Sequence, residues 1–401
     1  MTRTQERFAR DWAALAGIGR DEASGGYRRY AWTGADLQLR AWFADQARQR
    51  GMTCEQDRNG NLWAWWGDRG PGAVVTGSHL DSVPDGGAYD GPLGVLSGFL
   101  AIDELRERGA WPARPVAVAC FADEEGARFG VACVGSRLLT GVLDPDAARG
   151  LRDGDGVTLA EAMRAAGANP AAMSADEPAL DRIGAFVELH IEQGRALDAP
   201  VGIATGIWPH GRWRLRLRGE ANHAGTTWLA DRRDPMLPYA TTVLAAREAA
   251  GRAGALATFG KIAVVPNGTN AVPSAVDGWL DVRAPDEATL TAVVAEITAA
   301  ASASAAAHQV DVEVSGESYT PGVSFDHALS DRVAAAAGGL PALPTGAGHD
   351  AGILSARVPT AMLFVRNPTG VSHSPAEFAE AADCVTGIQA LGAVLEELAC
   401  R

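Results

Sequence analysis

Short apolar runs alternate with helix-like segments from about residue 12 to residue 200. The runs Ala73–Thr76, Pro115–Phe121 and Phe186–Ile191 are nearly continuous in apolar residues and end at turn residues, which is typical of buried strands. Gly91–Arg108 predicts a helix that begins directly after a Gly-rich turn. This alternation predicts an α/β domain whose strands are largely parallel.

The middle of the chain has a different pattern, because its strands alternate strictly between apolar and polar residues. Such strands have one face packed on helices and one face that is wet or covered by a partner. The predicted order is β-α-β-β-α-β, which is typical of a ferredoxin-like unit. Its elements are Trp213–Arg218, a helix around Pro238–Arg252, strands near Thr258–Val265 and Gly278–Arg283, an Ala-rich helix at Glu287–Ala307, and Gln309–Val314.

After Pro321 the α/β pattern returns, with a helix near Ala328–Ala337 and an apolar strand at Thr360–Val365. We therefore expect a small domain of residues 206–316, called the lid domain below, inserted into a larger one. The larger, catalytic domain would consist of residues 1–205 and 317–401. The chain would leave the large domain, form the lid domain and return.

Charge and cysteine content restrict the partners. The formal net charge of −14 and the lack of a Lys/Arg run argue against nucleic acids and acidic membranes, which need a basic surface. Five scattered cysteines without C-x-x-C spacing indicate a reducing compartment. With no secretory signal at the start and no stretch expected to span a bilayer, the sequence predicts a cytoplasmic protein.

Three histidines are candidates for metal binding, namely His79 in GSHLDSVPDGGAYDG, His190 in VELHIEQG and His373 in GVSHSPAE. Each lies at or just after the end of a predicted strand. In an open α/β sheet the carboxyl ends of the strands converge on one crevice, so these residues can meet there. A single histidine at a strand end is more often structural, and the coincidence of three favours a metal site.

Carboxylates occupy the same kind of position. Asp90 follows His79 by eleven residues, and the pair Glu124–Glu125 follows the strand that ends at Phe121. A mixed nitrogen and oxygen site suits Zn²⁺, Mn²⁺ or Co²⁺ better than Ca²⁺. Two cations would need a bridging carboxylate, for which Asp90 is the candidate.

The neighbours of these ligands can divide the work. One member of the pair Glu124–Glu125 can bind metal while the other acts as general base. Asp81, two residues after His79, is counted as catalytic, because it is expected to accept a hydrogen bond from the second ring nitrogen of that histidine and so fix its tautomer.

Eight motifs together resemble the M20 metallopeptidase superfamily, and within it the hydantoinase/carbamoylase branch of allantoate amidohydrolases, N-carbamoyl-L-amino-acid hydrolases and β-ureidopropionases. The similarity extends from about residue 70 to residue 380. The motifs, in chain order, are SHLDSVPDGGAYDG, ADEEGARFG, GSRLLTG, ELHIEQG, HAGTT, PNGTNAVPS, GAGHDA and SHSPAE.

This resemblance implies two divalent cations (Mn²⁺, Zn²⁺ or Co²⁺) in each subunit, with Glu124 as the general base that takes a proton from a bridging water. The implied metal ligands are His79 and His190 for one cation, Glu125 and His373 for the other, and Asp90 as the bridge.

The resemblance also implies a substrate-binding set and a homodimer formed through the lid domain. Arg283 would receive a substrate carboxylate, while His223 and Asn270 would donate to the oxygen that becomes negative during hydrolysis. The implied set is Gln193, His223, Asn270, Arg283, Gly348 and His349, with His223 also counted as catalytic. Whether lid residues act within one subunit or across the dimer stays open.

The segment Gly346–Ala351 allows two interpretations. Its main-chain amides can form an anion-binding start of a helix, or His349 and Asp350 can simply cap that helix. The HAGTT motif is followed by Trp228 and Leu229 instead of the usual Pro-Met, and residues 208–210 before the first lid strand are also unusual. These aromatic groups either alter the accepted substrate or pack an interface.

The sequence thus predicts a metal-dependent hydrolase of carbon–nitrogen bonds other than peptide bonds, which cleaves the ureido or carbamoyl amide of a small carboxylate such as allantoate or an N-carbamoyl-L-amino acid. A dipeptidase or aminoacylase of the same superfamily is the alternative among hydrolases. A non-catalytic binding protein that keeps the fold is the alternative from another class.

Overall fold

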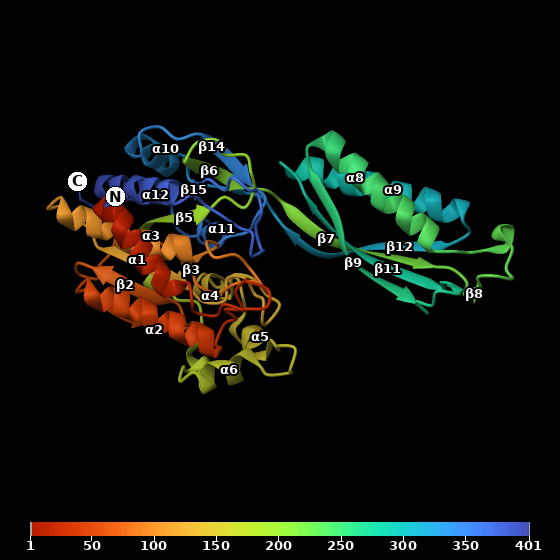
Figure 1. The fold of residues 1–401 in the computed structure, drawn as a ribbon, viewed down its shortest axis with the longest axis horizontal. Coiled ribbons are helices and arrows are strands. Elements are labelled where there is room, and N and C mark those ends of the chain that lie inside the picture. The colour runs from red at the N-terminus through yellow and green to blue at the C-terminus, as the bar shows by residue number, and fades with distance from the viewer. Residues whose placement is uncertain (1, 401) are drawn as a thin grey trace. The chain divides into compact units, whose positions relative to one another are not determined.

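The computed structural model describes residues 2–400, which form two compact units (Figure 1). The first unit runs to Thr205 and resumes at Phe325, and the second is Gly206–Ser324. The second unit extends eight residues beyond the boundary at 316 that the sequence suggested. Half of this difference arises because strand β12 (Asp311–Thr320) continues past the alternating segment QVDVEV into polar residues.

A nine-stranded sheet has the order β1-β2-β4-β3-β5-β15-β6-β13, with β14 beside β6, and it belongs to the first unit except for β13 and the last two residues of β6. Its centre, β4-β3-β5-β15, is parallel, and the outer pairs β1–β2, β2–β4, β15–β6 and β6–β13 are antiparallel. The mixed α/β fold is therefore confirmed. The strands are β1 Thr53–Gln56, β2 Leu62–Trp66, β3 Ala73–His79, β4 Val116–Phe121, β5 Ile183–Ile191, β6 Val201–Ile207, β13 Val323–Ser324, β14 Ala342–Thr345 and β15 Thr360–Val365.

Helices α3 (Pro92–Glu107), α12 (Ala381–Leu395) and α1 (Arg3–Leu15) pack on one another, and α3 lies against β3 and β5. Helix α3 is apolar almost all round its first three turns, as expected of a helix buried between a sheet and other helices. The remaining helices of this unit are α2 Gly34–Gln49, α4 Val134–Leu139, α5 Pro145–Gly150, α6 Leu159–Ala165, η1 Pro170–Ala172, α7 Glu177–Leu180, α10 His327–Ala336, α11 Asp350–Leu354 and η3 Glu396–Cys400.

The second unit is a four-stranded antiparallel sheet in the order β12-β7-β11-β9, with two helices packed on one face. Both the element order and the strand order are those of a ferredoxin-like unit. Alternate residues of β7 point to the helices, and the opposite face carries ion pairs such as Arg214–Asp277 at 2.6 Å. Its elements are β7 His210–Arg218, β8 Asn222–His223, η2 Leu229–Asp231, α8 Met236–Ala253, β9 Leu256–Val265, β10 Ala271–Val272, β11 Ala275–Arg283, α9 Glu287–Ala307 and β12.

The sequence predicted no stretch able to span a bilayer. Helix α9 contradicts this expectation, because by length and composition alone it is long and apolar enough to cross a membrane. Its mean hydropathy of 1.5 comes largely from alanine, which makes the helix apolar without a wide apolar surface. Leu290, Val293 and Ile297 on one side pack into the core of the second unit. That packing is what a helix covering a sheet requires.

Candidate metal centre

The predicted ligands lie where four neighbouring parallel strands end. His79 is the last residue of β3, His190 lies next to the end of β5, and Glu125 follows β4. Asp90 precedes α3, and His373 follows β15 with a left-handed backbone (φ 55°). These strands are adjacent in the sheet, so side chains that are as many as 294 residues apart in sequence come together at one edge.

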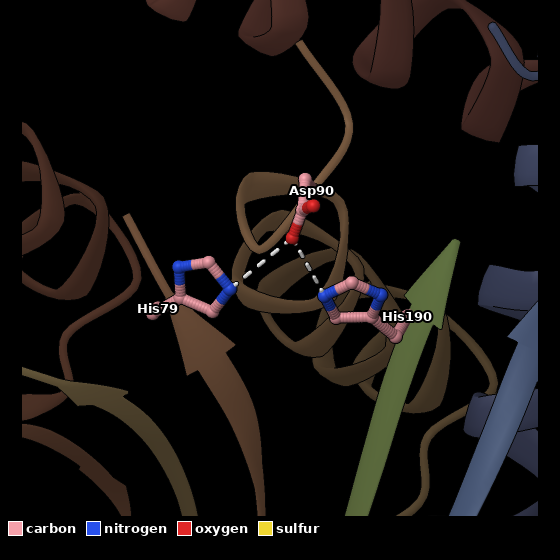
Figure 2. Close-up of side chains that lie close together, drawn as sticks. All are labelled: His79, Asp90 and His190. Carbon is pink, nitrogen blue, oxygen red and sulfur yellow. Dashed lines mark ion pairs between the residues drawn. The ribbon is translucent and has the colours of Figure 1, made fainter. Parts of the chain in front are cut away.

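Asp90 is at the centre of the cluster. Its Oδ1 lies 3.4 Å from Nε2 of His79 and 3.2 Å from Nε2 of His190, and Figure 2 shows both rings pointing at this carboxylate. Its Oδ2 lies 3.4 Å from Nε2 of His373. Burial raises the pKa of Asp90, but the three imidazoles outweigh burial and hold it well below the usual value. Asp90 is therefore a carboxylate at neutral pH, as a metal ligand must be.

Two potential ligand groups share Asp90. One consists of His79, Asp90 and His190, and the other of Asp90, Glu125 and His373, with the ligand atoms of each group within 4.8 Å of one another. Nε2 of His79 and Oε1 of Glu125 are buried without a hydrogen-bond partner, which is costly for a polar atom unless something binds it. Two imidazoles with a carboxylate, and one imidazole with two carboxylates, suit Zn²⁺, Mn²⁺ or Co²⁺. The residues therefore fit a pair of divalent cations.

Main-chain carbonyls fix the orientation of two imidazoles. Nδ1 of His79 lies 3.1 Å from the carbonyl oxygen of Asp81, and Nδ1 of His190 lies 2.8 Å from that of Ile191. A carbonyl can only accept, so each Nδ1 carries a proton, and in the neutral form of each ring the lone pair is then on Nε2, the nitrogen that would bind a metal.

The carboxylate of Asp81 also has contacts that the sequence did not suggest. It lies 3.5 Å from Nδ1 of His79, farther than the carbonyl of the same residue. It accepts the main-chain N–H groups of Glu124 and Glu125, at 3.1 and 3.0 Å. Asp81 thus holds the turn that presents both glutamates.

Glu124 lies beside the cluster and belongs to none of the candidate ligand groups among residues 2–400. It is buried, and its Oε2 is 3.7 Å from Nε2 of His79. Its Oε1 accepts a hydrogen bond from Sγ of Cys133 at 3.2 Å. Burial raises the pKa of Glu124 well above the usual value, against the attraction of His79. A carboxyl with a raised pKa next to a cluster of candidate metal ligands is a candidate general base.

Sequence reasoning missed Cys133, which forms this contact because the chain doubles back after Glu124. The main-chain N–H of Cys133 donates to the carbonyl of Glu124 at 2.6 Å, and its left-handed backbone (φ 56°) turns the chain into α4. A second missed residue is Glu377, in the SHSPAE motif, whose carboxylate binds the main chain at Asp90. Neither contact could be predicted, because no regular spacing of residues in the sequence indicates it.

Gln193 and His349 belong to the same cluster in the structure. Nε2 of Gln193 donates to Oδ2 of Asp90 at 2.7 Å and lies 3.2 Å from Nε2 of His373. The ring of His349 is buried 4.5 Å from that of His190, and burial lowers its pKa well below the usual value. His349 is therefore neutral, and its Nε2 is buried without a hydrogen-bond partner.

The segment around α11 does not have the His349 cap that the sequence offered as one of two interpretations. The side chain of His349 makes no capping hydrogen bond to α11. The carboxylate of Asp350 accepts from Ser136, and the main-chain N–H of Ala351 donates to Glu188 at 2.9 Å. At least one amide at this helix start is thus bound by a carboxylate of the protein itself. Gly348 directly precedes His349 and leads into this buried segment.

In the second unit, His223 and Asn270 lie together. β8 pairs with β10, and the main-chain N–H of Ala224 donates to the carbonyl of Asn270 at 3.0 Å. Both side chains are exposed. Nδ1 of His223 accepts from the N–H of Gly225 at 3.0 Å, so in the neutral ring the proton is on Nε2. Nε2 is then a hydrogen-bond donor.

Arg283 lies on the four-stranded sheet, at the end of β11 that is farther from the β8–β10 pair. It is the last residue of β11 and pairs with His210, whereas Ala275 at the other end of β11 pairs with Arg218, shortly before β8. At about 3.4 Å for each residue, the strand alone separates Arg283 from the His223 end by roughly 27 Å. Nε of Arg283 donates to Asp281 at 3.0 Å. The structure therefore does not bring Arg283 together with His223 and Asn270 within one unit.

The chain matches the model of peptidase family M20/M25/M40 over residues 75–397. It is 36% identical to an N-carbamoyl-L-amino acid amidohydrolase of Geobacillus stearothermophilus, covering 97% of this chain and 98% of the relative. It is 33% identical to an allantoate amidohydrolase of Escherichia coli, covering 96% of each chain. The structure resembles a crystal structure of a hydantoinase/carbamoylase family amidase from Burkholderia multivorans, with a TM-score of 0.89, 31% identity and coverage of 99% and 98%.

A parallel sheet with His and carboxylate residues gathered at its strand ends is the arrangement of a metal-dependent hydrolase. The chain belongs to peptidase family M20/M25/M40, and the resemblance to its hydantoinase/carbamoylase branch is confirmed.

Proposed function

We propose that this protein is an amidohydrolase that cleaves the ureido or carbamoyl C–N bond of a small carboxylate, such as an N-carbamoyl-L-amino acid or allantoate. The observation that carries the proposal is Asp90, which is shared by two potential ligand groups while Glu124 lies beside them outside both. The printed activities of the relatives, which cover nearly the whole chain, support this substrate class.

His79, Asp90, Glu125, His190 and His373 would hold two divalent cations. When bound, these cations would favour the ionised form of Glu124, polarise the scissile carbonyl and lower the pKa of an attacking water. Glu124 would take a proton from that water at Oε2, the oxygen that faces His79, and later give it to the leaving nitrogen. Cys133 would keep the other oxygen, Oε1, turned away.

Residues of the second unit would bind the substrate. Arg283 would pair with the substrate carboxylate. His223, whose proton is on Nε2, would donate a hydrogen bond to the oxygen that becomes negative, and Asn270 would assist from the adjacent strand. Gln193, Gly348 and His349 would line the same substrate site, with Gln193 also donating to Asp90.

A substrate panel tests this function directly. Manganese-loaded protein is incubated with N-carbamoyl-L- and D-amino acids, allantoate, β-ureidopropionate, N-acyl amino acids and dipeptides. Hydrolysis of R–NH–CO–NH₂ with one water yields R–NH₂, CO₂ and NH₃, whereas a dipeptidase or aminoacylase releases an amino acid without ammonia. We expect ammonia release from ureido substrates. Activity confined to dipeptides or N-acyl amino acids would refute the proposal in favour of that alternative.

We further propose a homodimer in which the second unit of one subunit completes the site of the other. The separation of roughly 27 Å along β11 supports this arrangement, because one small substrate cannot reach both Arg283 and His223 of the same unit. Strand β9 is a sheet edge with exposed Leu256, Ile262 and Val265, which is a surface suited to pairing with a second copy.

Co-expression of two inactive variants tests the shared site. A Glu124→Gln subunit keeps His223, and a His223→Ala subunit keeps Glu124. If His223 serves the partner, each mixed dimer has one intact site of two, and random pairing restores about a quarter of wild-type activity. Activity no higher than that of the separate variants would show that His223 acts within its own subunit.

A cytoplasmic location is also proposed. All five cysteines, which lie within residues 2–400, are unpaired, as expected in a reducing compartment. Cell fractionation would check this, and recovery with membranes would contradict it.

A further inference from the structure

Glu377 is a buried glutamate for which the proposed reaction has no role. It lies four residues after His373, in the segment between β15 and α12, and only 4% of it is exposed. Burying a carboxylate is costly unless hydrogen bonds compensate it. The contacts of Glu377 therefore indicate what this residue does.

The carboxylate of Glu377 binds the main chain of the Asp90 loop. Its Oε1 accepts the N–H of Tyr89 at 2.9 Å and the N–H of Asp90 at 3.0 Å. Its Oε2 accepts the hydroxyl of Ser372 at 3.3 Å. One side chain thus links the loop that carries the shared ligand Asp90 to the segment that carries His373.

The loop is shaped to receive this carboxylate. At Gly87 a Cβ atom would lie 2.3 Å from Oε1 of Glu377, so only glycine allows the main chain to come this close. On the other side of Ser372, Nε2 of Gln193 lies 3.2 Å from its Oγ and donates to Oδ2 of Asp90. Asp90 is therefore held at its main chain by Glu377 and at its side chain by Gln193.

We propose that Glu377 is a positioning residue for the metal centre, which fixes the main chain of Asp90 relative to His373 and so sets the spacing of the two ligand groups. This inference rests on the proposed function, because it needs two cations that share Asp90. Glu377 belongs to none of the candidate ligand groups among residues 2–400, so it acts through Asp90 and His373.

Geometry, rather than charge, is the property that this role requires. Both amides donate to the same oxygen, Oε1. A glutamine keeps one carbonyl oxygen at that place and turns its NH₂ towards Ser372, whose hydroxyl can accept. An aspartate keeps the charge but is one methylene shorter. The two substitutions therefore separate position from charge.

The experiment is a calorimetric titration of metal-free, full-length protein with Mn²⁺. Changing a residue that orients metal ligands typically weakens binding by about 10- to 100-fold. We expect a loss of this size for Glu377→Ala and a clear weakening for Glu377→Asp, whereas Glu377→Gln should bind two equivalents at close to wild-type affinity. Circular dichroism monitors folding, and if the alanine variant does not fold, the Asp and Gln variants carry the test.

Asp57→Ala is the matched control. Asp57 is a partly buried carboxylate that likewise accepts two main-chain N–H groups, those of Asn59 and Asn61, both at 2.9 Å. Its loss should reduce stability but leave Mn²⁺ affinity unchanged. A merely structural role of Glu377 would give the same result for the two alanine variants.

Three outcomes would overturn the role of Glu377. These are wild-type affinity in the Ala or Asp variant, a Gln variant as weak as the Ala variant, and an equal loss of affinity in Asp57→Ala. The proposed function fails separately, because it is contradicted when the wild-type protein itself binds no Mn²⁺.

Discussion

The two units of this protein present their chemistry in opposite ways. In the first unit, His79, Asp90 and His190 are buried, and each has a partner that fixes its orientation. In the second unit, His223 and Asn270 are exposed on a short two-stranded ribbon. The candidate metal ligands thus all lie in the first unit, whereas His223 and Asn270 in the second unit face solvent.

This difference follows from what each group must do. A metal site binds well only when its ligands are already in place, which burial and orienting hydrogen bonds provide. Residues that meet a substrate must first let it enter, and exposed residues on a separate unit allow this. We therefore expect changes in the first unit to affect metal content or kcat, and changes in the second to affect KM or substrate choice.

Removal of metal should have the largest effect. Chelation of the purified protein is expected to abolish hydrolysis, because the buried ligands of the first unit would lose the cations that polarise the substrate. Addition of Mn²⁺, Co²⁺ or Zn²⁺ should restore it. Initial rates before and after dialysis against chelator measure this. Hydrolysis that persists after chelation would contradict the proposal that the first unit holds the catalytic cations.

Glu124→Gln should come next. The variant is expected to lose at least about 10²-fold in kcat, the usual contribution of a general base, while keeping its metal. Glu125→Gln is the matched control, because this variant lacks a proposed metal ligand and should lose metal as well as activity. Steady-state kinetics with elemental analysis separate the two, and near-normal turnover of Glu124→Gln would exclude it as the base.

Arg283→Ala should have a smaller and different effect. Loss of a charge-assisted pair with the substrate carboxylate is expected to raise KM by about 10-fold or more, with metal content unchanged. Arg216→Ala is a suitable control, because Arg216 lies on the same sheet and pairs with Glu313 at 3.1 Å. An unaltered KM in Arg283→Ala would place the anion site elsewhere.

Trp228→Ala should have the smallest effect. Trp228 is 79% exposed, beside the exposed Leu229. If it contacts substrate, its removal should shift the ratio of kcat/KM between ureido substrates with large and small apolar groups by less than about 10-fold, which is the worth of one apolar contact. An unchanged ratio together with dissociation of the dimer would instead assign Trp228 to the interface.

Much of the first unit could be predicted because its signals are local. Buried parallel strands are continuous apolar runs in the sequence. Residues that follow such runs lie at one edge of the sheet. This rule predicted that His79, His190 and His373 would lie together. Strand β2 escaped notice although all five of its residues are buried, because the run LWAWW is short and tryptophan does not distinguish a strand from a helix.

What could not be predicted depends on register and on main-chain contacts. The distance between Arg283 and His223 is fixed by the pairing of β11 with β7, which no periodicity reveals. The roles of Asp81 and Glu377 are similar cases, since each carboxylate binds main-chain amides far along the sequence. Any carboxylate can do this, so the sequence carries no specific mark of it.

The most direct test is a crystal structure of the manganese-loaded protein with anomalous scattering data. We predict two Mn²⁺ peaks about 3.5–4 Å apart, both in contact with the Asp90 carboxylate, with Glu124 bound to neither. A single peak, or two peaks that do not share Asp90, would contradict the two-metal centre.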